Sequence, residues 1–310
     1  MKKTLPVLLL LIWQSLVSQI EYLPAIKPSD QIVQHYAYTL CYSEQHEQAA
    51  WVAYTLTKSR VYGTTKRTDN FRPDPKVKTG SASLADYKSS GYDRGHLAPA
   101  ADMKWSTTAM SESFYMSNMS PQTPGFNRGI WKKVEQVIRD WAVDNGEIHV
   151  VTGPVLKGQL KRIGPDQVAV PNYYYKVVLD YKEPELKGIG LILPNESSSR
   201  PIQSYAVTID QVEAVTGIDF FIDLPDNIEE QIESNLDLSK WSFSASHYSK
   251  PVAPGKSQIV PIKGDQIVYI TKTGKKYHKD GCSSLSSSKI PIKLENAIKR
   301  GYGPCKKCWP

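Results

Sequence analysis

Cysteine is scarce in this 310-residue sequence, and its distribution does not suit a disulfide scaffold. Three of the four cysteines fall within the last thirty residues, and only Cys41 belongs to the rest of the chain. Disulfides therefore do not hold the main part of the chain together. Internal repeats are also absent. A hydrophobic content of 40% nevertheless suits a packed globular core and excludes a wholly disordered chain.

A long apolar run is missing as well. The N-terminal run Leu5–Trp13 is shorter than the about 20 residues that span a bilayer. Lys2 and Lys3 precede it and small residues follow near Ser18, a pattern typical of a secretory signal peptide over residues 1–18. An uncleaved anchor is the alternative. A lipoprotein is disfavoured, because no cysteine lies near this segment. We expect a secreted or periplasmic protein without stable membrane association.

A charge excess is lacking over most of the chain. Of its 38 lysines and arginines, ten follow Gly264, together with only three of its 31 acidic residues. Residues 1–263 are therefore balanced, and the net charge of +7 comes from the C-terminal segment. Such a tail suits a polyanionic partner such as nucleic acid, or it simply forms a solvated face.

The pattern of apolar residues predicts an α+β domain, because strands and helices are grouped without regular βαβ alternation. Paired strands are predicted early in the chain, at Tyr36–Tyr42 and Trp51–Leu56, followed by a long loop at 63–90 and a turn at Asp93–His96. Later elements are a helix at Gly129–Val143 with Trp131, Val134, Ile138 and Trp141 on its buried face, strands at Ile148–Val151, Tyr173–Leu179 and Ile189–Leu193, and a helix between Thr208 and Gly217.

Four short motifs carry the chemistry. They are Tyr92–Pro99 (YDRGHLAP), Ser117–Gln122 (SNMSPQ), Phe126–Gly129 (FNRG) and Trp131–Glu135 (WKKVE). Each is weak alone: Asn127 before a helix is by default an N-cap, and Glu135 on a helix is by default an exposed charge. Together they supply what hydrolysis of an anionic phosphodiester requires, namely a base, a fixed cation and a metal ligand.

Each role follows from the side chain. His96 has an ordinary pKa near neutrality and can accept a proton from water, while Arg94 offers a fixed positive charge to phosphate. Asn127 presents a neutral oxygen for a hard cation such as Mg²⁺, which needs few protein ligands. Glu135 lies eight residues further on, roughly two helical turns, and is predicted to share a face with Asn127.

The ordered set of motifs resembles the DNA/RNA non-specific endonuclease family, the endonuclease G-like members of the ββα-metal (His-Me finger) nucleases. The resemblance runs from about Tyr36 to Leu224. It implies a mixed, mainly antiparallel sheet carrying a ββα-metal finger. It also implies magnesium-dependent cleavage of DNA and RNA that leaves 5′-phosphate and 3′-hydroxyl ends. Homodimers occur among such proteins, so a homodimer is a possible assembly.

The resemblance also assigns roles to individual residues. His96 would be the general base, Asn127 the direct ligand of Mg²⁺ or Mn²⁺, and Glu135 the residue that orients a water on the metal. Arg94 stands beside the base. Asn118 matches an asparagine that supports the site, and Arg67 matches a further arginine that contacts phosphate. Asp93 is expected to hold local geometry.

The C-terminal segment predicts a small metal-stapled unit. His278 and Cys282 have H-x3-C spacing, and Cys305 and Cys308 have C-x2-C spacing, which together can complete a tetrahedral Zn²⁺ site. Apolar residues between 290 and 298 predict a short helix over it. A disulfide is the alternative, because an exported protein meets oxidising conditions. The lysines of this unit would hold nucleic acid or keep the tail soluble.

The predicted organisation is a signal peptide at 1–18, an endonuclease domain at 19–240, a Ser/Pro/Lys-rich linker at 241–264 and the zinc-binding-like unit at 265–310. Two other functions stay open. A nucleic-acid-binding protein without turnover would bind in a metal-independent way, and a phosphodiesterase acting on other substrates would leave a circular plasmid intact.

Overall fold

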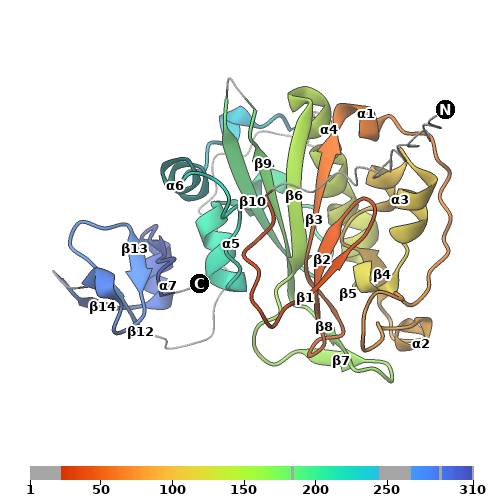
Figure 1. The fold of residues 1–310 in the computed structure, drawn as a ribbon, viewed down its shortest axis with the longest axis horizontal. Helices are drawn as coiled ribbons and strands as arrows, with labels where there is room; N and C mark the ends of the chain where they lie inside the picture. The colour runs from red at the N-terminus through yellow and green to blue at the C-terminus, as the bar shows by residue number, and fades with distance from the viewer. Residues whose placement is uncertain (1–21, 183–184, 244–266, 286–287, 309–310) are drawn as a thin grey trace, which may run out of the picture.

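The computed structural model describes residues 22–182, 185–243, 267–285 and 288–308. The predicted signal peptide lies outside these ranges, and so does the predicted linker from residue 244 onward. Residues 22–243 form the main body, and residues 267–308 form the C-terminal unit (Figure 1). No helix in the described ranges is both long and apolar enough to cross a membrane.

The main body is built on one antiparallel sheet of seven strands. In spatial order the strands are β1 (Gln31–Gln34), β2 (Thr39–Ser43), β3 (Gln48–Thr57), β6 (Glu147–Pro154), β9 (Tyr173–Asp180), β10 (Lys187–Pro194) and β11 (Ala206–Val207). The predicted pairing of the first strands is confirmed, because Cys41 on β2 lies opposite Trp51 on β3. The predicted α+β class with a mainly antiparallel sheet is confirmed as well.

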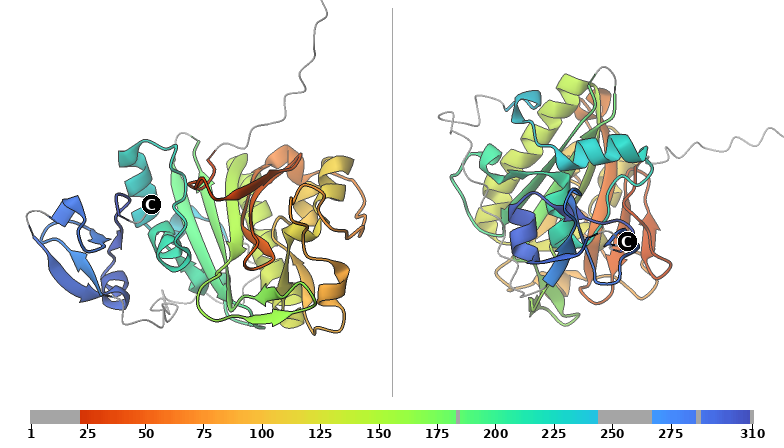
Figure 2. Two further views of the ribbon diagram at one scale, coloured as in Figure 1. Left: turned by 60° about the horizontal axis from the view of Figure 1, so that its bottom comes forward. Right: turned by 90° about the vertical axis from the view of Figure 1, so that its left-hand side faces the viewer.

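Both faces of this sheet are covered, because successive strand residues point to opposite sides. On β9, Tyr174 faces Phe126 and Trp131, whereas its neighbour Tyr175 faces Phe220. The two sides belong to separate hydrophobic clusters. Figure 2 shows these layers. The helices of the main body are α1 (Lys58–Val61), α2 (Leu84–Tyr87), α3 (Thr107–Glu112), α4 (Lys132–Asn145), α5 (Ile209–Thr216) and α6 (Asp226–Ser234).

The longest helix, α4, packs on the first of these faces. All four residues predicted for its buried side, Trp131, Val134, Ile138 and Trp141, are almost fully buried. The helix begins later than predicted, because Gly129 has a non-helical backbone (φ −103°, ψ −110°) that separates α4 from a π-helical turn before it.

Helices α5 and α6 lie against the opposite face, near β9 and β10. The predicted limits of α5 are confirmed. Thr208 caps it by accepting a hydrogen bond from the Gln211 N–H (3.2 Å), and Gly217 ends it in the left-handed region (φ 73°). The motif on α4 that was predicted to be catalytic therefore lies on the other side of the sheet from the α5–α6 layer.

The segment Asp93–His96 is a strand, not the predicted turn. It forms β4 and pairs antiparallel with β5 (Met119–Gln122). With α4 these two strands form a ββα arrangement, as the resemblance implied. Gly95 is required here, because a Cβ at this position would lie 2.1 Å from the Gln122 Cδ. A second short hairpin joins β7 (Lys161–Ile163) and β8 (Val168–Val170).

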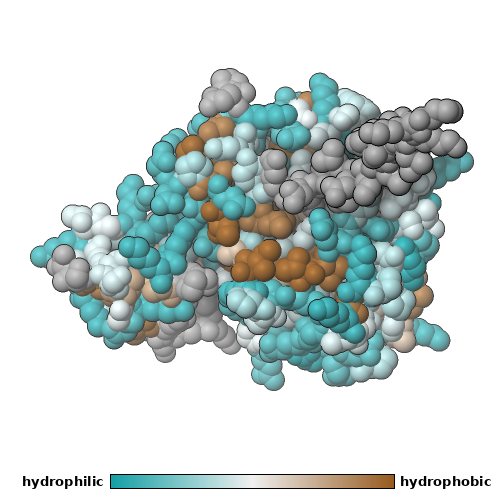
Figure 3. Space-filling model, viewed as in Figure 1, coloured by the Kyte–Doolittle hydropathy of each residue, from teal (hydrophilic) through white to brown (hydrophobic). Residues whose placement is uncertain are grey.

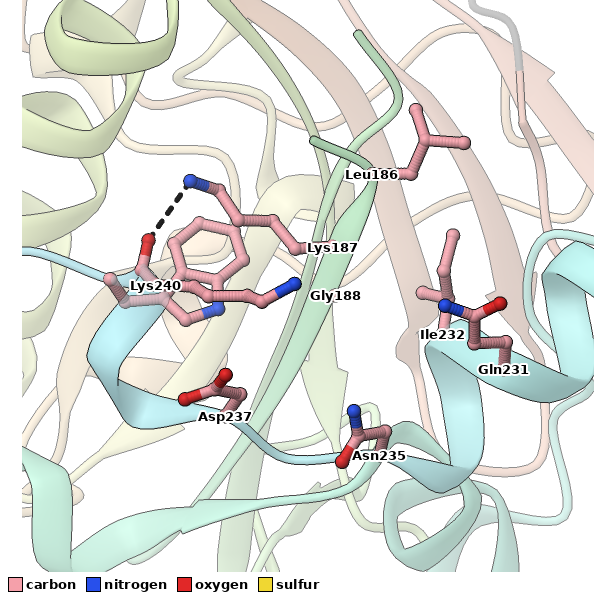
Figure 4. Close-up of a pocket in the computed structure, with 9 residues that line it drawn as sticks. Leu186, Lys187, Gly188, Gln231, Ile232, Asn235, Asp237 and Lys240 are labelled. Atoms are coloured by element: carbon pink, nitrogen blue, oxygen red, sulfur yellow. Dashed lines mark hydrogen bonds between the residues drawn. The ribbon is translucent and has the colours of Figure 1, made fainter. Parts of the chain in front are cut away.

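The main body extends past the predicted boundary at residue 240. Trp241 is 3% exposed and packs against Trp141 of α4, with ring centroids 4.6 Å apart. It also closes a small hollow between β10 and the end of α6, where the Lys187 Nζ donates to the Lys240 carbonyl oxygen at 2.9 Å (Figure 4). Trp241 thus belongs to the core, and the linker prediction began too early.

The C-terminal unit folds around a sheet of four short strands. Its elements are β12 (Ile267–Ile270), β13 (Lys276–His278), β14 (Ile290–Lys293), α7 (Leu294–Lys299) and β15 (Gly303–Pro304). The helix predicted over 290–298 is wrong in its first half, because Ile290 and Ile292 lie on β14, with the period of two that a strand produces. The surface of this unit is mostly hydrophilic, whereas an apolar patch lies near the middle of the main body in the same view (Figure 3).

Candidate active site

His96 lies at the end of β4 between two aromatic rings. Its ring is edge-on to Phe71 and Phe114, with centroids 5.8 and 4.9 Å away. Its Nε2 is buried and makes no hydrogen bond within the described residues. Burial, with smaller effects of Arg67 and Arg94, lowers the pKa of His96 to about 3. The imidazole is therefore neutral at pH 7 and has a nitrogen available to take a proton.

Two arginines stand over the same aromatic rings. The Arg94 guanidinium lies 4.2 Å from the centre of the Phe71 ring, and that of Arg67 lies 4.7 Å from the centre of the Phe114 ring. Arg94 is exposed, and the Arg67 side chain is 50% exposed and donates to Asp69 at 2.6 Å. Stacking holds a guanidinium plane in place while its edge faces solvent or phosphate. The structure thus brings both predicted arginines to the predicted base.

Asn118 ties the chain behind the histidine. Its Oδ1 accepts from the Ala98 N–H, and its Nδ2 donates to the carbonyl oxygens of Ala98 and Ser113, all at 2.8–2.9 Å. In addition, the Leu97 N–H donates to the Asn118 carbonyl oxygen at 3.0 Å. The side chain is fully buried in these contacts. Asn118 is accordingly a positioning residue that fixes the backbone after His96.

Asn127 is held by the β4 strand. Its Nδ2 donates to the Asp93 Oδ2 at 2.9 Å, and Arg128 donates to both oxygens of the same carboxylate at 2.8 and 2.6 Å. These contacts confirm that Asp93 holds local geometry. The Asn127 Oδ1 has no hydrogen-bond partner in the described ranges, so this neutral oxygen is available to a cation. The helical spacing argument for Asn127 and Glu135 does not hold, because Gly129 interrupts the helix between them.

Glu135 lies in the first turn of α4, in the same electrostatic cluster. Burial raises the pKa of its carboxyl group to about 7, against the lowering effects of Lys176, Arg139 and Arg67. Arg67 lowers the pKa of both His96 and Glu135, so the two predicted residues lie within the electrostatic influence of one cation. The default interpretation of Glu135 as an exposed helix charge is therefore wrong.

Three charged residues of this cluster were missed by sequence reasoning. Arg139 donates to the Asp102 Oδ1 at 2.8 Å. The Lys176 Nζ lies 3.2 Å from the Thr152 Oγ1 and 3.4 Å from the carbonyl oxygen of Leu97, the residue after the base. Two signals were present: Arg139 follows Glu135 by four residues, and Lys176 interrupts an apolar strand.

The tyrosines beside Lys176 take no part in the site. Tyr174 and Tyr175 are fully buried in the core.

The four residues predicted to bind zinc come together in the C-terminal unit. One ligand atom from each of His278, Cys282, Cys305 and Cys308 lies within 4.8 Å of all the others. The Cys282 and Cys305 sulfurs are 3.9 Å apart, a separation that suits two thiolates on one zinc ion and not a disulfide of about 2.05 Å. All four cysteines of the chain are free thiols, and Cys41 is buried apart on β2.

Known proteins resemble this chain over the same region. Residues 18–227 match the family model for DNA/RNA non-specific endonucleases. A nuclease from a Nostoc strain is 35% identical over 224 residues, covering 68% of this chain and 81% of that protein. Human mitochondrial endonuclease G is 33% identical over 205 residues, covering 61% and 69%. The crystal structure of an EndoG/EndoGI complex aligns with a TM-score of 0.61 and 29% identity, over 66% of this chain and 89% of that one.

The matched range includes β4, β5, α4 and each candidate active-site residue, and it ends inside α6, before the C-terminal unit. His96, the two arginines stacked beside it and the ββα arrangement thus all lie inside the region that matches this family. The chain is a nuclease that belongs to the DNA/RNA non-specific endonuclease family.

Proposed function

We propose that this nuclease is an exported, magnesium-dependent endonuclease that cuts DNA and RNA with little sequence preference. The observation that supports it best is the environment of His96: a neutral imidazole whose buried Nε2 has no partner in the described residues, with an arginine over each flanking aromatic ring. A general base needs such an unprotonated nitrogen, and an anionic substrate needs such fixed cations.

The residues divide the reaction between them. His96 accepts a proton from the water that attacks phosphorus. Arg94 and Arg67 neutralise the negative charge of the phosphate as it increases in the transition state. The bond from phosphorus to the 3′ oxygen breaks, so the products carry 5′-phosphate and 3′-hydroxyl ends. Asn118 and Lys176 contact the backbone that follows the base and keep it in place.

The donor set beside the base fits a hard divalent cation. Asn127 would supply its Oδ1 as the direct ligand, an oxygen of the kind that Mg²⁺ or Mn²⁺ prefers, and the Glu135 carboxylate would orient a water on the cation. When bound, the cation supplies positive charge at the scissile phosphate and the leaving oxygen. Arg139 and Lys176 favour the ionised form of Glu135, which is the form that serves such a site.

Low sequence preference follows from the same residues. The candidate site offers cations and oxygen ligands, which contact the phosphate backbone shared by DNA and RNA. The relatives are named a nuclease and an endonuclease, which supports this substrate class. Export rests on the N-terminal signal-like sequence, and structural Zn²⁺ in the C-terminal unit rests on the Cys₃His cluster. A homodimer stays a prediction.

The test is cleavage of supercoiled plasmid and of single-stranded RNA by residues 19–310, with Mg²⁺ or with EDTA. We expect metal-dependent cutting of both, and we expect His96→Ala to lower kcat by roughly 10²–10⁴-fold while its circular dichroism spectrum is unchanged. The matched control is His46→Ala, a histidine on the β2–β3 turn outside the site. Binding without cutting by folded wild-type protein would favour the nucleic-acid-binding alternative, and an intact plasmid with hydrolysis of smaller diesters would favour a phosphodiesterase.

A further inference from the structure

The C-terminal unit contacts the main body through buried charges that the nuclease reaction does not use. Carboxylates from α5, α6 and the loop between them gather on the sheet face opposite α4. The group consists of Glu213, Asp219, Glu229 and Glu233, which we name the carboxylate cluster. Glu233 is completely buried, and its Oε1 has no hydrogen-bond partner within the described residues.

One lysine of the C-terminal unit is inserted into this cluster. The Lys306 Nζ lies 3.3 Å from the Asp219 Oδ1 and 3.2 Å from the Glu233 Oε2, and it forms an ion pair with Glu229. Removing a cation that buried carboxylates share is destabilising, because the carboxylates repel one another in a poorly solvated space. The cluster is therefore matched to a single inserted cation.

The surrounding contacts fit a specific interface. Lys276 pairs with Asp210 on α5 at 3.4 Å, and Ala214 of α5 packs against the apolar core of the C-terminal unit. Gly303 approaches so closely that a Cβ would lie 2.3 Å from the Asp210 Oδ2. Helix α5 thus contacts the C-terminal unit through an ion pair, an apolar contact and a close approach of the backbone.

Lys306 lies in the turn between Cys305 and Cys308, two of the residues predicted to bind zinc, and we name this turn the metal loop. The Cys308 N–H donates to the Cys305 carbonyl oxygen at 3.1 Å, which makes a tight turn with Lys306 at its tip. A metal ion held by both cysteines would fix this turn, and its removal would release the two ends.

We propose that the carboxylate cluster is the docking site for the chain's own C-terminal unit, that Lys306 is the inserted cation, and that metal loading of the Cys₃His cluster holds Lys306 in place. The metal part of this inference rests on the zinc site proposed above. Metal at the C-terminal unit then controls its attachment to the main body, on the side of the sheet away from His96.

The experiment uses residues 19–310 with a protease recognition sequence inserted in the predicted linker. After cleavage, association of the two pieces is measured by size-exclusion chromatography and titration calorimetry, and zinc content is measured by mass spectrometry. We expect zinc-loaded wild-type pieces to stay together. The dissociation constant of the two pieces should be at least about tenfold higher than that of zinc-loaded wild type in two cases: in Lys306→Met, and in wild type treated with a zinc chelator. Lys307→Met, at the exposed neighbouring lysine, is the matched control and should not change it.

A second variant covers the possibility that Lys306→Met disturbs the metal loop itself. Glu229→Gln with Glu233→Gln leaves the C-terminal unit untouched and should also weaken association. Association of Lys306→Met or of chelated protein as tight as wild type overturns the proposal, and so does a wild-type chain that docks without binding zinc. Plasmid cleavage is measured in parallel, so that loss of nuclease activity is distinguished from loss of docking.

Discussion

At the scale of single residues, the environment of His96 makes folding depend on pH. Its pKa is about 3 in the folded chain and about 6.5 when unfolded, so the unfolded state binds more protons between these values. The contribution of His96 to stability is therefore lost as pH falls from 6.5 toward 3. The free energy of unfolding, measured in urea, should fall between pH 7 and pH 4.5, and this fall should be about 2.5 kcal/mol smaller in His96→Gln. An equal difference in both proteins would mean that His96 is not held neutral by the fold.

Asn118 is a residue whose role is structural support of the base. Asn118→Ala removes three buried hydrogen bonds to Ala98 and Ser113, and it should lower the free energy of unfolding by about 2–4 kcal/mol. The control is Asn70→Ala, an exposed amide bonded to Ser111, which should change stability by less than about 0.5 kcal/mol. Equal losses in urea titrations of the two variants would contradict the positioning role.

At the scale of elements, the β4–β5 pair depends on a residue without a side chain. Gly95→Ala places a Cβ against Gln122, which is fully buried opposite β4. The variant should lower the melting temperature and plasmid cleavage together, because overpacking shifts the strand that carries His96. Gly95→Ala with Gln122→Ala should recover part of both losses. If the double variant is no better than the single one, the clash with Gln122 is not the cause.

Elements with a clear apolar period were predictable from sequence, and elements set by pairing were not. Helix α4 and strands β6, β9 and β10 follow from their buried positions. The strand β4 has the sequence Asp-Arg-Gly-His, which has no alternation, so only its pairing with β5 defines it. Likewise, Arg139 pairs with Asp102, 37 residues away, and Lys176 reaches Leu97, 79 residues away. Contacts of such separation leave little local pattern in a sequence.

At the scale of the whole molecule, several basic residues of the C-terminal unit form ion pairs within the protein. Lys276 and Lys306 pair with acidic residues of α5, α6 and their loop, and Lys289 pairs with Asp280 in its own unit. Two lysines of the basic C-terminal segment, Lys276 and Lys306, are therefore used in contacts with the main body. The unit also docks on the face of the sheet opposite α4 and the candidate active site.

This arrangement predicts which cations nucleic acid meets during cleavage. Each phosphate contact by a lysine or arginine contributes about −0.9 to the slope of log affinity against log salt for duplex DNA. Arg94→Gln, beside His96, should therefore reduce the steepness of that slope by about one. Replacing Lys272, Lys275 and Lys307, three exposed lysines of the C-terminal unit, with serine should leave the slope unchanged. Filter binding of a DNA duplex at several salt concentrations in EDTA measures both. A shallower slope in the triple variant would show that the C-terminal unit binds nucleic acid. The basic tail would then contribute to substrate binding, as its charge alone suggested.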